Sequence, residues 1–567
     1  MNSLQTNLQA WERLLFLINR NQELNLKTEP PRALNFCGRE SVTDSYFNTL
    51  SKSANLNLMP VPKTSLPLWR RLLRLLALLI VLFLCGSSAR FFWMTRDRNP
   101  GYTLNLSVSP SAAIANPKPL KAGFGRRIIT PDISNPARPV WLAGFDQGRS
   151  ALRVHDDLYA VAIVIDDGSH RIGVVSIDSI GLFHDDTLAI RRALADELNL
   201  DYVTVCATHN HSTPDLMGLW GRDILHSGVD PEYRARVIRD AAASLTDAVK
   251  SLQPVRLTAH EIISSPEGLV ADTRKPEVFD ADLRVLHCVS IADGQTLGSL
   301  VGWGNHPETP WADNRDLTAD FPGIIRNSLE KGIIYDGKVH LPGLGGIHVF
   351  VNGAVGGLMT THPSVTVKDP FIKADFKIPS HDKTRAVGNV LVARILNRLA
   401  TNTLPSVTTA PIAIEAQTLE IPVANRGFLV AGFLGLLDRG HSKFLTMRTE
   451  IAVIQIGTIS ITCIPGEIYP ELVNGGVVKT PGGDFNMEPL EIPPLRELMP
   501  GQVKFIFGLA NDEIGYIIPK SEWDMEAPFN YGAKGAPYGE INSLGPETAR
   551  LLHTALSRLC KKIQAQP

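Results

Sequence analysis

Two histidines stand one residue apart in the segment VCATHNHSTPD, where an apolar run ends. They are His209 and His211, in a chain with only 15 histidines. Neutral imidazole is a common ligand of zinc and a common general acid or base. On a continuing strand the two rings would point to opposite faces, so they can serve one site only if the chain bends here. The Ser-Thr-Pro-Asp that follows favours a bend; the alternative is a polar turn with one capped histidine.

Three more side chains suited to metal chemistry follow other apolar runs. His306 ends the run SLVGWGNH, Glu467 follows ISITCIPG, and Tyr538 stands in the Gly- and Pro-rich segment GAPYGEINSLGP. Taken singly, they fit a turn histidine, a carboxylate at a helix start and a packing aromatic. Functional side chains gather on loops held by a rigid scaffold. Imidazole, carboxylate and phenol together therefore predict a zinc site with room for a water.

The elements that must position these side chains alternate between helices and strands, with frequent hairpins. This pattern predicts an α/β fold, a large single catalytic domain with mixed β-sheets flanked by helices, and a lobe boundary near 402–410 is the alternative. We expect hairpins over 159–180 and 282–308, helices over 186–200, 230–252, 383–401 and 546–563, and strands over 409–422, 449–456 and 458–464.

The N-terminal part contains an apolar segment preceded by basic residues. Residues 66–94 read LPLWRRLLRLLALLIVLFLCGSSARFFWM. The uncharged core is short for a membrane span and suits a signal peptide, while a signal-anchor is the alternative. Met59 stands just ahead, so residues 1–65 are expected to be disordered or a mis-assigned extension. We expect a linker over 95–119, a catalytic domain over 120–567, and export to the periplasm or outside, or anchoring by residues 69–93.

Composition excludes several classes of partner. The formal net charge is -1, and no basic stripe is present, so we expect no nucleic acid partner. No protein partner is evident. None of the six cysteines forms a CxxC pair, and Cys206, Cys288 and Cys463 lie in apolar runs, so they are expected as buried thiols.

The order of the motifs resembles the catalytic domain of neutral (alkaline, non-lysosomal) ceramidases. The motifs are GFGRRIITPD (123–132), ATHNHS (207–212), WGNHP (303–307), IPGEIYPEL (464–472) and YGEINSLGP (538–546). The resemblance implies hydrolysis of the amide bond of N-acylsphingosine at one Zn²⁺ per chain, with a lipid amide as substrate and a membrane surface as partner. The C-terminal immunoglobulin-like domain of the longer members is not part of the match.

The resemblance also implies roles for individual residues. The metal ligands would be His209, His306, Glu467 and Tyr538, and His211 would face the scissile carbonyl. Two further residues are matched more loosely. Arg274 in VADTRKP would contact the substrate, and Asp320 in LTADFPG would support a metal histidine, with an exposed helix-start aspartate as the alternative.

Departures from the family pattern leave the substrate open. The family's HSGPGG appears here as HSTPDL, and FVNGAVGGLMTTHP (350–363) lacks a Ser-Pro-Asn. The metal residues are kept while the loops that shape the substrate are altered. Hydrolysis of another envelope or soluble amide or ester, or an inactive envelope protein with this fold, are the alternative functions.

Overall fold

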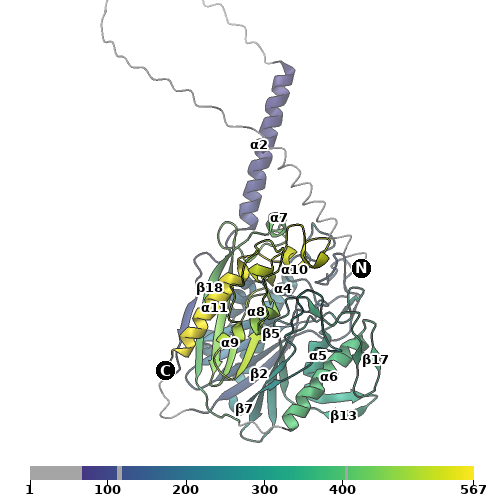
Figure 1. Ribbon diagram of the computed structural model, residues 1–567, viewed down its shortest axis with the longest axis vertical. Coiled ribbons are helices and arrows are strands. Elements are labelled where there is room, and N and C mark those ends of the chain that lie inside the picture. Colours follow the sequence, from purple (N-terminus) through teal and green to yellow (C-terminus); the bar gives the residue numbers. More distant parts are fainter. Residues whose placement is uncertain (1–66, 111–117, 402–405, 567) are drawn as a thin grey trace, which may run out of the picture. The chain divides into compact units, whose positions relative to one another are not determined.

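The computed structural model describes residues 67–110, 118–401 and 406–566 (Figure 1). The chain divides into two units, Met1–Ala89 and Arg90–Pro567. Helix α2 (Leu68–Met94) is a continuous helix of 27 residues, longer than the apolar core of the sequence suggests. Among the described residues it is the one helix long and apolar enough to cross a membrane. The expectation for residues 1–65 falls outside the described residues.

The first sheet of the second unit has eight strands. Its order is β14 (Ile347–Asn352), β10 (Thr296–Trp303), β9 (Leu283–Ser290), β7 (Gln253–Ile262), β2 (Lys121–Ile128), β4 (Tyr159–Asp166), β5 (Arg171–Ile177) and β6 (Tyr202–Ala207). The sheet is mixed, because β5–β6 and β10–β14 are parallel pairs and the others are antiparallel. Both predicted hairpins are confirmed, as β4–β5 and β9–β10.

The second sheet has five strands and packs on the first. Its order is β1 (Asn105–Val108), β18 (Ile412–Pro422), β19 (Thr446–Ile456), β20 (Ile459–Cys463) and β22 (Val503–Phe507). One apolar core joins residues of both sheets. Strand β1 lies inside the segment expected as a linker over 95–119. That expectation is wrong for these residues, because β1 pairs antiparallel with β18 and so belongs to the body.

Strands between two layers must be apolar on both faces. In β4, Val161 and Ile163 belong to the core between the sheets, while Ala160 and Ala162 belong to the core under helix α4 (Pro231–Lys250). Asp230 caps α4 by accepting from the backbone N–H groups of its first turn. The GFG motif lets α4 approach closely: a Cβ on Gly125 would lie 2.1 Å from the carbonyl oxygen of Ser244.

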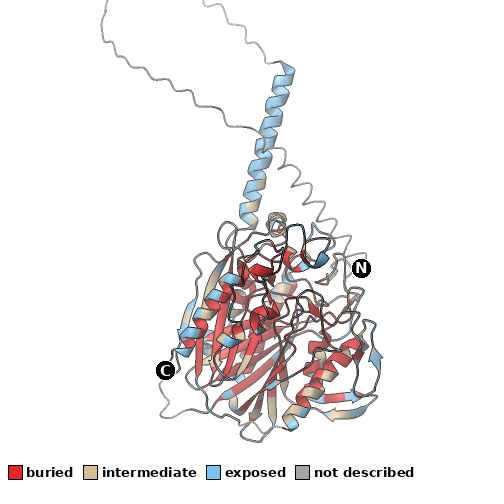
Figure 2. Cartoon of the chain, in the orientation of Figure 1, coloured by how far each residue is buried: buried red, intermediate tan, exposed pale blue. Residues whose placement is uncertain are grey.

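The remaining helices complete four layers. Helices α4, α5 (Asp320–Lys331) and α6 (His381–Ala400) cover the eight-stranded sheet, and α11 (Thr548–Gln564) covers the five-stranded sheet. Figure 2 shows both sheets buried throughout their centres. The mixed α/β prediction is confirmed, and Arg90–Pro567 forms one unit without a boundary near 402–410. Among the described cysteines, Cys206, Cys288, Cys463 and Cys560 are buried free thiols.

Short elements connect the layers. The helices are α3 (His184–Arg192), α7 (Arg426–Leu434), α8 (Pro470–Asn474), α9 (Leu495–Leu498) and α10 (Tyr538–Ile541). The two-stranded pairs are β3 (Arg153–Val154) with β11 (Asp316–Leu317), β8 (Ala271–Asp272) with β15 (Met359–Thr360), β12 (Gly332–Tyr335) with β13 (Lys338–Pro342), β16 (Val367–Lys368) with β17 (Asp375–Phe376), and β21 (Glu467–Ile468) with β23 (Tyr516–Ile517).

Candidate metal centre

The two histidines of the ATHNHS segment meet at the end of β6. His209 has a φ of 65°, a left-handed conformation that turns the chain out of the strand direction. The ring centroids of His209 and His211 are consequently only 5.1 Å apart. The predicted bend is confirmed. His306, which follows β10, joins them, with its ring centroid 4.6 Å from that of His209.

The carboxylate of Glu467 lies between two of the rings. Its Oε2 is 3.3 Å from Nε2 of His209 and 3.0 Å from Nε2 of His306. All three side chains are buried. Burial opposes ionisation of Glu467, but the two imidazoles outweigh it and hold the pKa of this carboxyl well below its usual range. The structure therefore brings together three of the predicted metal ligands.

Backbone carbonyls fix which nitrogen of each imidazole faces the carboxylate. Nδ1 of His209 donates to the carbonyl of Ile180 at 2.7 Å, and Nδ1 of His306 donates to that of Met359 at 2.8 Å. In a neutral ring the proton then sits on Nδ1, and both Nε2 lone pairs point toward Glu467 Oε2. Two lone pairs and a carboxylate oxygen repel one another unless a positive charge lies among them, either a proton on an Nε2, which the low pKa of Glu467 reflects, or a bound metal ion. The donor set fits a divalent metal such as zinc.

A tyrosine outside the predicted set supplies an oxygen to this cluster. The hydroxyl of Tyr516 is 3.4 Å from Nε2 of His306, and the side chain is buried. Burial and the nearby Glu467 raise the pKa of Tyr516 well above its usual value. Tyr538 lies against Tyr516: the ring centroids are 5.9 Å apart, and Tyr538 is 40% exposed. The apolar surroundings of Tyr516, in IGYII, give it the sequence signature of a core residue.

Asn352 at the end of β14 ties the two histidine loops together. Its amide nitrogen donates to the carbonyls of Thr208 and Asn305, at 3.0 Å each. These residues directly precede His209 and His306. Asn352 is completely buried. Its two hydrogen bonds therefore fix the distance between the chain segments that carry His209 and His306. The sequence alone marks it only as the asparagine of the FVNG motif.

A buried glutamate faces His211. Oε2 of Glu308 lies 3.1 Å from Nδ1 of His211, and the two side chains are 9% and 12% exposed. Burial lowers the pKa of His211 to about 4, although Glu308 acts in the opposite direction. Burial also opposes ionisation of Glu308, but His211 lowers its pKa on balance. Glu308 stands two residues after His306, at the same strand end, which is the sequence signal that could have identified it.

Asp320 is buried at the start of α5 and supports the His306 loop. Its Oδ2 accepts from the backbone N–H of Thr309 at 2.9 Å, and burial raises its pKa to about 7. The exposed alternative does not hold, since Asp320 is 1% exposed. Its contact with the site runs through the Thr309 backbone, and the imidazole N–H groups are held by carbonyl oxygens instead.

Arg274 is engaged in a buried ion-pair network. Its guanidinium bonds to Glu471, lies 3.0 Å from Glu522 and stacks over Tyr469 at 4.1 Å. It follows β8, which pairs with β15, the strand whose Met359 holds His306. The structure thus engages the Arg274 guanidinium with the carboxyl groups of Glu471 and Glu522.

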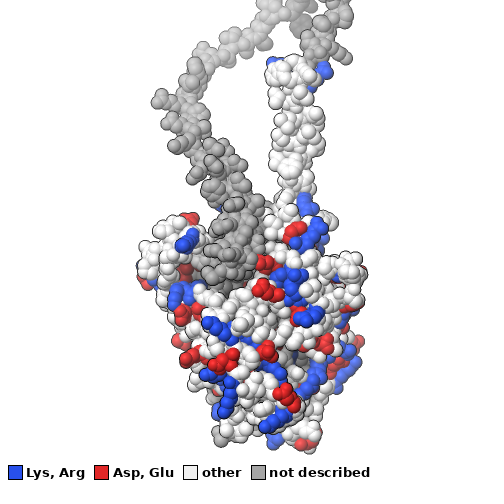
Figure 3. Space-filling view, turned by 90° about the vertical axis from the view of Figure 1, so that its right-hand side faces the viewer, with Lys and Arg blue, Asp and Glu red and all other residues white. Residues whose placement is uncertain are grey.

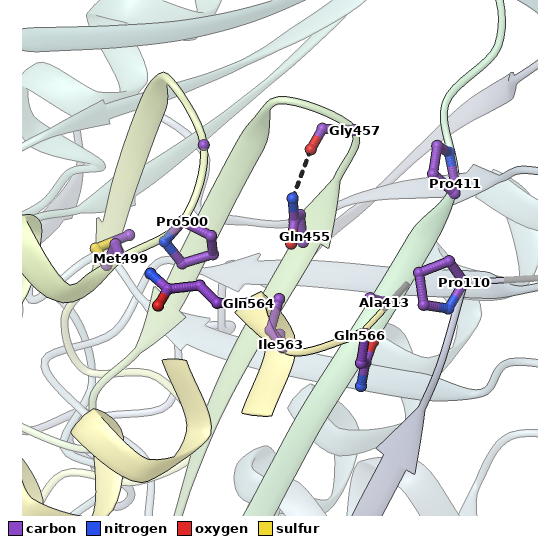
Figure 4. Close-up of a pocket in the computed structure, with 11 residues that line it drawn as sticks. Pro110, Pro411, Ala413, Gln455, Gly457, Met499, Pro500, Ile563, Gln564 and Gln566 are labelled. Carbon is purple, nitrogen blue, oxygen red and sulfur yellow. Dashed lines mark hydrogen bonds between the residues drawn. The ribbon is translucent and has the colours of Figure 1, made fainter. Parts of the chain in front are cut away.

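A surface pocket elsewhere on the unit lacks the chemistry of a catalytic site. It has a volume of about 500 Å³ and lies where β18, the β19–β20 turn and the end of α11 meet (Figure 4). Prolines and glutamines are prominent in its lining, for example Pro110, Pro411, Gln455 and Pro500. None of its lining residues can titrate or bind a metal strongly. The histidine cluster is therefore the candidate functional site.

Comparison with known proteins gives a match at the level of structure. No family model matches the chain, and no curated protein sequence matches it. A crystal structure of neutral ceramidase from Pseudomonas aeruginosa superposes with a TM-score of 0.58 at 16% identity, covering 80% of this chain and 76% of that one. A ceramidase complexed with C2 gives a TM-score of 0.58 at 16% identity, covering 79% and 75%. The four-layer α/β unit described above has the fold of neutral ceramidases.

Proposed function

We propose that this chain is a zinc-dependent hydrolase of an N-acyl amide bond, with ceramide or a related lipid amide as substrate and a fatty acid and an amine as products. One observation carries the proposal: two Nε2 lone pairs and the Glu467 carboxylate converge on one point. The fold likeness to neutral ceramidases supports the same reaction class. We further propose that α2 directs export of the enzyme, either as a cleaved signal sequence or as a retained membrane anchor.

The residues divide into a metal-holding set and a proton-handling set. His209, His306 and Glu467 would hold zinc, with Tyr516 in place of Tyr538 as the fourth donor. When bound, zinc would acidify a water molecule and polarise the amide carbonyl. Both effects are needed because an amide is a poor electrophile at neutral pH.

His211 is assigned the proton transfer to the leaving amine. Glu308 engages its Nδ1, which leaves Nε2 as the nitrogen that gives or takes a proton. A carboxylate on the far side of an imidazole fixes its orientation and stabilises the imidazolium that forms during proton transfer. The buried setting also excludes bulk water from the reacting atoms.

The full-length chain in detergent should cleave a fluorescent short-chain ceramide. Zinc is measured by mass spectrometry on the same sample. We expect about one zinc per chain and loss of activity on chelation, restored by zinc. His306→Ala is the matched variant and should lose zinc and activity together. An active sample free of divalent metal would contradict the assignment.

A second candidate is hydrolysis of a soluble amide. The altered HSTPDL loop is the observation behind it: Asp215 holds a local turn here by accepting from the backbone N–H groups of Met217, Gly218 and Trp220. Cleavage of short water-soluble N-acyl amines, but not of ceramide, would select this function. Bound zinc without cleavage of either substrate class would indicate an inactive protein with this fold.

A further inference from the structure

Helix α7 presents an apolar surface that the rest of the unit covers only in part: Phe428, Leu429 and Leu434 pack against the core and keep some exposure. Its sequence is RGFLVAGFL, and only Ala431 and Gly432 of its nine residues are buried. A group of apolar side chains that keeps contact with solvent is typical of an interaction surface. Phe444 and Leu445, in the loop before β19, extend this surface and are 67% and 37% exposed.

The last residues of α2 are built into the same surface. Arg90 Nη2 donates to the carbonyl of Leu434 at 2.9 Å and Nε to that of Phe433 at 3.2 Å, which satisfies the open C-terminal end of α7. The Phe91 and Phe92 rings lie 6.2 Å and 6.0 Å from that of Phe444. All these residues belong to the unit Arg90–Pro567.

The composition of this surface is that of a membrane interface. Phe92 and Trp93 are 60% and 64% exposed, and the guanidinium of Arg96 stacks over the Trp93 ring at 4.1 Å. Aromatic rings flanked by basic side chains are typical of the zone where lipid headgroups meet acyl chains. Elsewhere charges of both signs are interspersed, as the face shown in Figure 3 illustrates. The net charge of -1 agrees with this.

We propose that α7, Phe92, Trp93, Phe444 and Leu445 form a lipid-facing surface that rests in the interface of the bilayer that α2 spans. The bilayer is the occupant because the last residues of α2, from Arg90 onward, belong to this unit and contact the surface, and α2 is long and apolar enough to cross a bilayer. The proposal rests on α2 being retained as an anchor. It deepens the proposed function by naming the membrane, rather than solution, as the source of the substrate.

A short path of contacts joins this surface to the metal cluster. Asn425 caps α7, and its side-chain amide donates to the carbonyls of Ile541 and Ser543 at 2.7 Å and 2.8 Å. Ile541 is the last residue of α10, which begins at Tyr538, and Ser543 follows two residues later. Tyr538 in turn lies against Tyr516 of the cluster. A lipid drawn from the bilayer beside α7 would meet α10 before the metal ligands.

Site-directed fluorescence on the full-length chain tests the lipid-facing surface. In a background with Cys37→Ser and Cys85→Ser, an environment-sensitive dye is attached at Phe444→Cys or at Ile263→Cys. Ile263 is the matched control, since it is apolar, 89% exposed and outside the surface. Both proteins are reconstituted into phosphatidylcholine vesicles containing phosphatidylglycerol. We expect blue-shifted emission and quenching by nitroxide-labelled lipid at position 444 only. Equal water exposure at both positions, or shielding without lipid quenching, would overturn the proposal.

Rates of hydrolysis of two substrates distinguish the lipid-facing surface from the proposed function. Phe92→Glu with Phe444→Glu should slow hydrolysis of ceramide in vesicles by about tenfold or more, while hydrolysis of a soluble N-acyl amine stays unchanged. Ile263→Glu should affect neither substrate. If the Phe92→Glu/Phe444→Glu double variant and Ile263→Glu hydrolysed vesicle ceramide at equal rates, the membrane would not be the source of the substrate. If the unaltered chain cleaves neither substrate, the proposed function fails, and the fluorescence result still decides the surface.

Discussion

Glu467 and Tyr516 are direct partners in the parallel pairing of β21 with β23. Neighbouring strands in a sheet lie about 4.8 Å apart, so this register alone sets the carboxylate and the phenol side by side. Both follow strands of the five-stranded sheet, β20 and β22, which are themselves parallel neighbours. The two histidine loops come from the other sheet. The metal centre is therefore assembled where the two sheets meet, from loops that follow strands of each sheet.

Replacement of each tyrosine distinguishes the fourth ligand. Tyr516→Phe should lower zinc affinity and turnover by about tenfold or more, because it removes an oxygen 3.4 Å from His306 Nε2. Tyr538→Phe is the matched control and should keep stoichiometric zinc. Zinc titration against a chromogenic chelator measures both. Retention of full affinity in Tyr516→Phe with loss in Tyr538→Phe would restore the sequence-based assignment.

Glu308→Gln keeps the shape of the side chain and removes its charge. We expect kcat to fall by about 10²-fold, because the imidazolium at His211 loses its carboxylate, while KM and zinc content change little. Glu308→Asp should recover part of the rate. Steady-state kinetics with zinc analysis of the same samples measures this. A variant that loses zinc instead would show that Glu308 acts on the metal ligands.

Asn352→Ala should loosen the metal site as well as the fold. It leaves the carbonyls of Thr208 and Asn305 without their donor, and each unsatisfied buried group costs about 1–3 kcal/mol in the free energy of unfolding. Asn389→Ala is the control: this buried amide bonds to Tyr335 and Asp369, outside the metal site. Both variants should be destabilised in urea, and only Asn352→Ala should bind zinc more weakly. Equal zinc affinity of Asn352→Ala and Asn389→Ala would contradict the role of Asn352 in positioning the two histidines.

Arg274→Ala tests whether this residue contacts the substrate. Removing one partner from a buried ion pair costs about 3–5 kcal/mol, so loss of the links to Glu471 and Glu522 should destabilise the fold strongly. The loss of stability should then be the main effect, and any change in KM should be smaller. Urea unfolding and kinetics on the same preparation are compared. Unchanged stability with a raised KM would support the substrate-binding role implied by the family resemblance.

Because His348 is buried in its neutral form, the protein should lose stability in acid whether or not a metal is bound. Its Nε2 donates to the Gly345 carbonyl and its Nδ1 accepts from the Ser299 hydroxyl, an arrangement that requires a neutral ring. Burial lowers its pKa to about 4. The unfolded chain binds this proton near pH 6.5, so stability should fall between pH 6.5 and pH 4, by up to roughly 3 kcal/mol. His348→Gln should flatten this part of the urea-unfolding profile, and an unchanged slope would contradict the assignment.

Local patterns predicted several of the longer helices and both hairpins. The expected helix over 230–252 is α4, because an Asp-Pro start and a 3.6-residue apolar period are properties of neighbouring residues. The hairpin over 159–180 follows in the same way from two apolar runs around Asp-Asp-Gly-Ser. The segment over 95–119 was misjudged, since an edge strand such as β1 is defined by its pairing with β18, more than 300 residues away.

The sequence by itself determined the chemistry available at this site: two histidines at a strand end, a third after another strand, and a glutamate after a Pro-Gly turn. Tertiary structure decided which groups meet. Tyr516 and Asn352 enter the site through strand register and the meeting of two sheets, and long-range contacts of this kind leave no periodic signal in the chain. The same kind of contact places Tyr538 against Tyr516 and pairs Arg274 with Glu471 and Glu522.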